Sequence, residues 1–152
     1  MKPFASAPFG VLGRIRSTAI VDWLDALVAY VATEIDVPLY PFSRPERYDG
    51  PVILYTPGID VYGYTHDGIE PWVSTPLTIE ANASDPDDAR ALDEAVRTVL
   101  EGYRGFLLGN RIDLVKSGLT TFRVGADSRR KWRVSVLTEY TVLRTLREVR
   151  VA

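Results

Sequence analysis

The spacing of apolar residues near the start of the chain predicts a helix. Between Ile20 and Ile35 they recur every three or four positions, which places them along one side of a helix. Ser17 and Thr18 offer N-caps for this helix. Pro38 disfavours helical backbone in the residue before it, so the helix is expected to end ahead of it.

A second helix is predicted after Asp85. Asp85 is a suitable N-cap and Pro86 fits the first helical position, where no amide hydrogen is needed. Gly102 favours an end shortly after the last apolar position. Within this helix the Asp93 and Arg97 side chains are spaced as an ordinary helix-surface ion pair.

Alternating or β-branched runs predict several strands. Pro76 falls inside one of them and has no amide hydrogen, so that strand is expected at a sheet edge or with a bulge. A break at Lys116-Ser117-Gly118 separates two others. The predicted strands cover residues 52–56, 72–81, 112–115, 119–124 and 132–143.

The last of these strands has a regular alternation. Trp132 and every second residue after it are mostly apolar and form one face, whereas Arg133, Ser135 and Glu139 point the other way. Such alternation is typical of a sheet with one face in solvent.

Two segments have the composition of contact surfaces. Residues 57–72 are rich in glycine and contain Asp67-Gly68, a tight-turn dipeptide, so they are expected to form a projecting loop or hairpin. Residues 1–16 contain two prolines and two glycines without periodicity, which predicts an extended arm. Aromatic residues are favoured at interfaces, and we expect these two segments to mediate subunit contact through Phe4, Phe9, Tyr62, Tyr64 and Trp72.

The pattern as a whole predicts an α+β fold. The expected order is helix, strand, strand, helix, strand, strand, strand, with a mixed, mostly antiparallel sheet of four to five strands and two main helices packed on one face. At 152 residues the chain is long enough for one domain with its own core. We therefore expect the arm at 1–16 and a single domain over 17–152.

Composition narrows the possible functions. The net charge is −2, so there is no overall positive field for nucleic acid. The chain has no cysteine, which excludes disulfides and thiolate metal sites. The apolar stretch from Ile20 to Ile35 is interrupted by charges and is too short to cross a bilayer. No membrane partner and no signal peptide are expected, and synthesis in a cytoplasm is the default.

The search for catalytic chemistry finds little. His66 is the only histidine and stands beside Asp67, an arrangement that is more simply interpreted as a loop histidine next to a turn aspartate. Asp85, Asp87 and Asp88 are better explained as the acidic first turn of a helix than as metal ligands. We therefore expect no enzyme activity, no catalytic residue, no metal site and no cofactor.

One basic cluster is notable. It lies at a predicted turn between two strands and consists of Arg129, Arg130, Lys131 and Arg133. The cluster is explained equally well by surface solvation and by binding to DNA phosphates or an acidic protein surface. In a ring the charge would be concentrated around the axis and could face the lumen or a partner.

Five segments together resemble the tail-terminator, or tail-completion, proteins of long-tailed bacteriophages. They are a helix leading to Val37-Pro38-Leu39-Tyr40, the strand Gly50-Pro51-Val52-Ile53-Leu54-Tyr55, the strand and turn at 77–85, the helix at 91–102 and the strand at 132–140. The resemblance covers about residues 20–143. The arm at 1–16 and the charged end at 144–150 depart from the family pattern.

The resemblance implies a virion structural protein without catalytic residues. Six copies would close into a ring on the tail tube, stop its growth and present a surface to the head-side connector, with DNA only passing through the lumen. Three alternatives remain. The first is a neck or head-completion protein of similar size and symmetry. The second is a small DNA-binding module that uses the basic cluster and would bind duplex DNA with a steep salt dependence. The third is an enzyme of unknown type, in which His66→Ala would have to abolish an activity.

Overall fold

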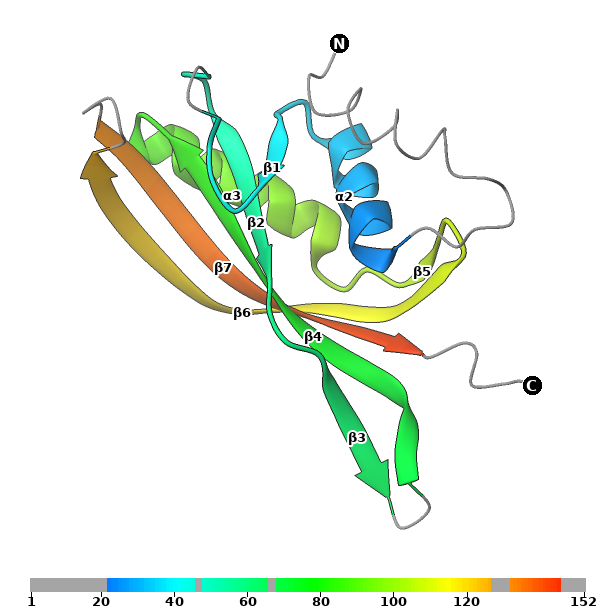
Figure 1. Cartoon of the computed structure of the whole chain (residues 1–152). Helices are drawn as coiled ribbons and strands as arrows, with labels where there is room; N and C mark the ends of the chain where they lie inside the picture. Colours follow the sequence, from blue (N-terminus) through cyan, green and yellow to red (C-terminus); the bar gives the residue numbers. More distant parts are fainter. Residues whose placement is uncertain (1–21, 46–47, 66–67, 127–131, 146–152) are drawn as a thin grey trace.

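The computed structural model describes residues 22–45, 48–65, 68–126 and 132–145. Its elements in chain order are α2 (Trp23–Glu34), β1 (Leu39–Pro41), β2 (Val52–Pro57), β3 (Val61–Thr65), β4 (Gly68–Ala83), α3 (Pro86–Leu100), β5 (Gly105–Leu107), β6 (Asn110–Ala126) and β7 (Trp132–Thr145). Figure 1 shows these elements as labelled. The predicted arm at 1–16 lies outside the described residues.

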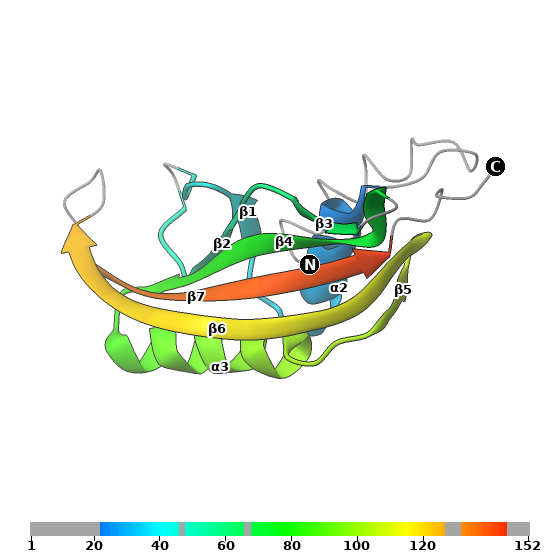
Figure 2. The ribbon, with the colours of Figure 1, turned by 90° about the horizontal axis from the view of Figure 1, so that it is seen from below.

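The strands form one seven-stranded sheet. Its order is β1-β2-β4-β7-β6-β5, and β3 pairs with β4 off this path. β1 and β2 are parallel, whereas all other pairs are antiparallel. The sheet is strongly curved, and its long strands β4, β6 and β7 bend together (Figure 2).

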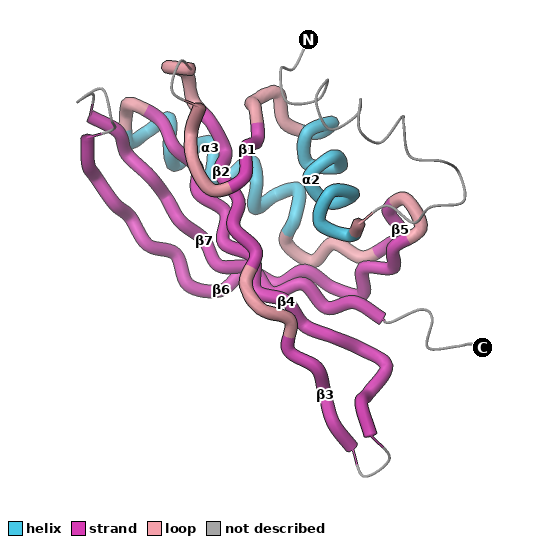
Figure 3. The backbone as a smooth tube through the Cα atoms, in the orientation of Figure 1, coloured by secondary structure: helices cyan, strands magenta, loops and turns pink. Residues whose placement is uncertain are grey.

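The expected sheet of four to five strands with two helices on one face is therefore wrong. The structure is mostly strand (Figure 3), and three of its seven strands, β1, β3 and β5, have only three to five residues. The two helices also do not both pack broadly on the sheet. α3 packs on β4, β7 and β6, whereas the main contacts of α2 are with α3 and β5.

The core fills the space between the helices and the sheet face that α3 covers. Leu27 and Val31 come from α2, Val96 and Leu100 from α3, and Tyr140 from β7, and all are almost completely buried. The same cluster includes Leu39, Ile53, Leu77, Ile79, Ile112, Val115, Val136 and Val142. Burial of these apolar side chains supplies most of the driving force for folding.

Both helices begin at identifiable caps. α2 begins at Trp23, and its N-cap is Asp22, whose Oδ2 accepts a 3.1 Å hydrogen bond from the Leu24 amide. The predicted caps Ser17 and Thr18 lie outside the described residues. α3 begins at Pro86 with Asp85 as its N-cap, as predicted, although the Asp85 side chain makes no capping hydrogen bond.

Pro76 was expected at a sheet edge or in a bulge, yet it lies in a central strand whose register with β7 is regular at that point. β4 is flanked by β7 along the whole of 72–83 and by β2 along 77–82. On the side of β4 away from β7, β2 ends at Pro57 and β3 begins at Val61, and Pro76 lies opposite the gap between these two strands. Its carbonyl accepts a 2.7 Å hydrogen bond from the Gly58 amide there. In antiparallel pairing a residue's amide and carbonyl face the same neighbour. The missing amide hydrogen therefore faces a break in the ladder.

The break predicted at Lys116-Ser117-Gly118 is also wrong. β6 runs through it as one strand paired with β7, and the register shifts between Ser117 and Thr120. Such a shift is a β-bulge, which lets a strand bend without ending. The single long β6 is therefore curved and not divided.

The face pattern predicted for the last strand needs correction too. Arg133 and Ser135 do not face solvent, since they are only 7% and 5% exposed. Trp132 was expected to share the apolar face, yet it is 68% exposed. The face of β7 opposite α3 is thus covered near the β6–β7 turn, whereas Trp132, the first residue of β7, projects beyond the core.

None of the helices that the structure describes is long and apolar enough to span a membrane.

Candidate interaction surfaces

The β3–β4 hairpin projects from the body of the molecule, as Figure 1 shows. Its base is held by Arg144 of β7, whose Nη2 donates a 3.1 Å hydrogen bond to Thr75 Oγ1 and lies 3.4 Å from Asp60 Oδ1. Thr75 Oγ1 in turn donates to Asp60 at 2.6 Å. The Arg144 guanidinium also stacks 4.5 Å from the centre of the Trp23 ring. One cation therefore joins the hairpin to α2 and β7.

Burial acts on the pKa of this cation. Desolvation lowers the pKa of Arg144, and the carboxylates of Asp60 and Asp22 oppose that effect. The guanidinium still stays charged at neutral pH, because the ordinary pKa of arginine lies far above 7. Breaking the ion pair would therefore leave a charge in a mostly buried position.

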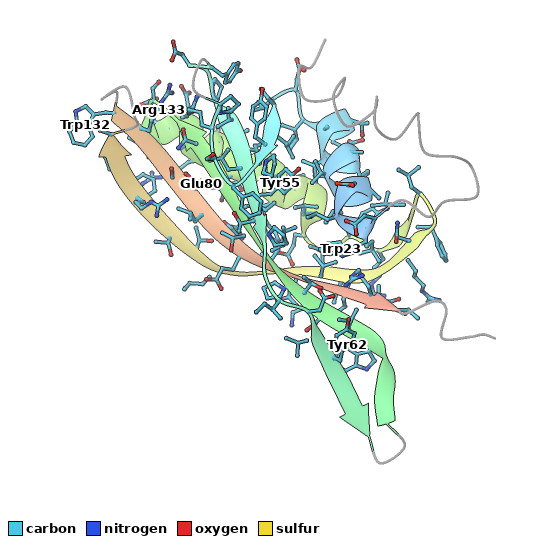
Figure 4. All side chains as sticks on the ribbon, in the orientation of Figure 1. Trp23, Tyr55, Tyr62, Glu80, Trp132 and Arg133 are labelled. Carbon is cyan, nitrogen blue, oxygen red and sulfur yellow. The ribbon has the colours of Figure 1, made fainter. Side chains whose placement is uncertain are left out.

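Two of the predicted contact residues lie on the hairpin. Tyr62 is 41% exposed and Trp72 39% exposed, and Figure 4 shows the labelled Tyr62 on the hairpin, away from the body. Val61 is exposed beside them. The side chain of Tyr64 and the residues Phe4 and Phe9 lie outside what the structure describes. Their predicted roles stay predictions.

A second exposed surface lies at the other end of the sheet. Phe122 and Val124 of β6 pair with Val136 and Val134 of β7, which places them on the α3 face. Both are nevertheless exposed, and Trp132 stands at the same end (Figure 4). The Arg90 guanidinium of α3 lies 5.4 Å from the Phe122 ring centre and covers part of it.

The basic cluster is only partly visible. Arg129, Arg130 and Lys131 lie outside the described residues. Arg133 is buried, and its Nη2 donates a 2.7 Å hydrogen bond to the Asp49 carbonyl. This contact ties β7 to the segment between β1 and β2, so Arg133 has a structural partner whatever the rest of the cluster does.

A buried polar network lies on the sheet face opposite α3. Asn82 accepts a 2.5 Å bond from Arg44 and donates to Ser135 Oγ at 2.8 Å, while Ser135 donates to Glu80 at 2.6 Å. Arg44 also donates to the carbonyls of Tyr48 and Gly50. The network therefore fastens the chain between β1 and β2 over β4 and β7. Together with Arg123 and Arg133 it lines an open hollow of about 200 Å³.

Catalytic and metal chemistry has no further support from the described residues. His66 lies outside them. Asp87 and Asp88 occupy the first turn of α3, and across the described ranges no three His, Cys, Asp or Glu side chains are grouped to hold a metal ion.

The fold is thus a strongly curved mixed sheet with one helix packed on it, a second helix beside the first, and a projecting hairpin. A similar fold occurs in a solved structure described as the virion of a native gene transfer agent (GTA) particle. The TM-score is 0.53 with 17% sequence identity, over 92% of this chain and 93% of the other. No family model matches the sequence, and no curated protein does. At this identity the likeness establishes a shared fold.

Proposed function

We propose that this chain is a virion structural protein of phage type, and that it forms a ring that caps a tail tube and joins it to the head-side connector. In this role it ends tube polymerisation through shape and surface contacts, without catalysing a reaction. The tail, at the junction with the head, is its proposed location. Its partners are further copies of itself, the tube protein and the connector, and DNA only passes through the lumen.

The observation that carries the proposal is the extent of the structural likeness. The match to a chain from a gene transfer agent virion spans more than nine tenths of both chains, so it concerns the whole arrangement and not a common substructure. The resemblance of five segments to tail-terminator proteins points to the same kind of particle. A fold does not define a function by itself, so the proposed role must also be supported by the exposed surfaces.

The exposed surfaces favour assembly into a ring. The projecting hairpin with Tyr62 and the β6 end with Phe122 and Trp132 are different surfaces on opposite sides of the molecule (Figure 1). A contact between two different surfaces is head-to-tail, and such contacts close into rings when the rotation between copies allows it. We propose a ring of six.

A neck or head-completion protein is the second candidate, because it would use the same fold and the same symmetry. The two roles differ in the partner that the ring requires. A tail terminator binds the end of a tube in the absence of heads, whereas a neck protein binds the head-side portal in the absence of tubes.

The test is deletion of the gene in the element that encodes it, followed by electron microscopy of the particles. Capping predicts tubes of abnormal and widely distributed length without attached heads, and restoration of a single length when the chain is supplied in trans. Tubes of normal length with empty or leaking heads would favour the neck role. Normal particles would contradict both.

A further inference from the structure

One edge of β6 is unpaired over its second half. β7 occupies the other edge, and β5 pairs with this one only from Asn110 to Ile112. Further along, the amide and carbonyl of Val115 bond to the backbone of Tyr103 and Gly102, and the Ser117 amide bonds to the Glu101 carboxylate. From Leu119 to Ala126, no described residue pairs with this edge. Its backbone amides and carbonyls are therefore available to another strand.

This edge lacks most of the features that prevent strand addition. Edge strands are commonly protected by proline, by shortness or by several charges. Residues 119–126 contain no proline and only one charged residue, Arg123. Leu119, Phe122 and Val124 are exposed along the same stretch. The edge is long, weakly charged and partly apolar.

β3 presents the complementary feature. It pairs with β4 on one side, and among the described residues its other side is open. An isolated two-stranded hairpin is only marginally stable in water, so a projecting hairpin gains from another surface. Val61 and Tyr62 are exposed on it.

The charges of the two segments are opposite. Residues 57–75 contain Asp60, Asp67 and Glu70 and no lysine or arginine. Residues 114–126 contain Lys116 and Arg123 and no aspartate or glutamate. Complementary potentials of this kind select the partner and its orientation.

We propose that β3 of one copy adds to the free edge of β6 in the next copy, so that the sheets of neighbouring subunits become continuous around the ring. The inference rests on the proposed ring. The hairpin and the β6–β7 end point away from each other in Figure 1, so the partner of β6 is a second molecule. The contact is head-to-tail, because its two halves differ.

Addition at this edge also explains the exposed apolar side chains. A strand laid beside β6 brings its own side chains next to Phe122, over which the Arg90 guanidinium lies, and next to the exposed Val124. Tyr62 suits this contact, because an aromatic residue pairs favourably with Phe or Val across two strands. Main-chain hydrogen bonds supply affinity in this mode, and alternate side chains supply specificity.

Cysteine cross-linking tests the contact directly, since the chain has no native cysteine. Tyr62→Cys is combined in turn with a cysteine at each position from 119 to 126, and the purified full-length chains are oxidised. Strand pairing predicts cross-linked ladders that end at the ring size, with a yield that rises and falls with a period of two residues. Glu94→Cys on the exposed side of α3 replaces the β6 cysteine as the control and should give no ladder.

Charge exchange provides an independent measurement. Lys116→Glu and Glu70→Lys should each weaken association at least several-fold, and the double variant should restore much of it. Lys116 is exposed and is preferred to Arg123, which lies 3.6 Å from Glu80 in the buried network. Circular dichroism and urea unfolding of each variant show that it remains folded.

The outcomes separate this inference from the proposed function. A ring that forms without alternating cross-links, and that is unaffected by both charge variants, overturns the β3–β6 contact and leaves the ring. A chain that stays monomeric alone and with isolated tail tubes, without cross-links, overturns both.

Discussion

Thr138 Oγ1 on β7 donates a 2.8 Å hydrogen bond to Asp93 Oδ1 on α3, and both side chains are buried. Arg97, one turn further along the helix, lies 3.2 Å from Asp93 Oδ2 and reaches Thr120 Oγ1 of β6 at 3.0 Å. The sequence suggested that Asp93 and Arg97 form an ordinary surface pair. That interpretation is wrong, because the pair joins α3 to two strands.

Loss of the Asp93 carboxylate should therefore destabilise the fold. Asp93→Ala leaves the Thr138 hydroxyl and one side of Arg97 without their acceptor in a mostly dry position. We expect a loss of about 1–3 kcal/mol in the free energy of unfolding, measured in urea. Asp93→Asn retains an acceptor and should lose less, and the exposed Glu94→Ala should change little. Equal effects for Asp93→Ala and Glu94→Ala would contradict the buried role.

Tyr140 should behave differently from its neighbour Thr138. Its hydroxyl is buried and forms no hydrogen bond with the residues that the structure describes. Tyr140→Phe removes a polar atom without removing a partner, so at pH 7 the free energy of unfolding should stay within about 1 kcal/mol or rise. Thr138→Val, which removes the bond to Asp93, should lower it. A large loss from Tyr140→Phe would show that the hydroxyl has an essential partner.

The buried tyrosines should make the stability of the fold depend on pH in the alkaline range. Burial, with the nearby Asp25 carboxylate, raises the pKa of Tyr55 to about 12, and burial followed by Asp93 raises the pKa of Tyr140 as well. The unfolded chain releases these protons near pH 10, whereas the folded chain retains them. Stability should be unaffected below pH 10 and should fall above it, and Tyr55→Phe should make that fall shallower. An unchanged slope would contradict the assignment.

Arg144 should hold the base of the hairpin in place. Arg144→Ala leaves Asp60 without its cation and removes a contact with Trp23. We expect a loss of about 1–3 kcal/mol and faster amide hydrogen exchange in Val61–Thr65, with little change in α3. The control is Arg111→Ala, which removes an exposed pair with Asp113. Exchange in β3 that does not respond to Arg144→Ala would show that the hairpin is held elsewhere.

Leu108 is expected to reduce stability. It forms the turn between β5 and β6 together with Gly109, and both residues have positive φ, 49° for Leu108 and 88° for Gly109. A two-residue turn of this kind favours Asn followed by Gly, since a leucine is strained there. Leu108→Asn should raise the free energy of unfolding by about 0.5–1 kcal/mol in urea. A loss of stability would mean that the exposed leucine packs on something.

The sequence predicted α3 well because its signals are local. Asp85, Pro86 and the apolar stripe specify the start and the buried side without help from the rest of the fold. The sheet was harder to predict. β1 and β5 have three residues each, which is too short for an alternating pattern, and they form by pairing with β2 and β6. Propensity within the short segment does not specify such strands.

Of the two candidate surfaces, the sequence predicted one and missed the other. The hairpin at 57–72 was predicted from its turn residues, and Tyr62 and Trp72 are exposed on it. The free edge of β6 was not predicted, because an edge is a property of strand order and not of one segment. The absence of proline and acidic residues from 114–126 was a signal, but only the sheet order gives it meaning. Likewise, nothing local marks Arg44 as the residue that reaches Asn82 on β4.

Native mass spectrometry of the purified chain, alone and with isolated tail tubes, shows whether the chain forms a ring. We expect one closed oligomer, a hexamer, either in solution or on the tubes, with no series of larger species. A chain that remains a monomer under both conditions, at every concentration, would contradict it.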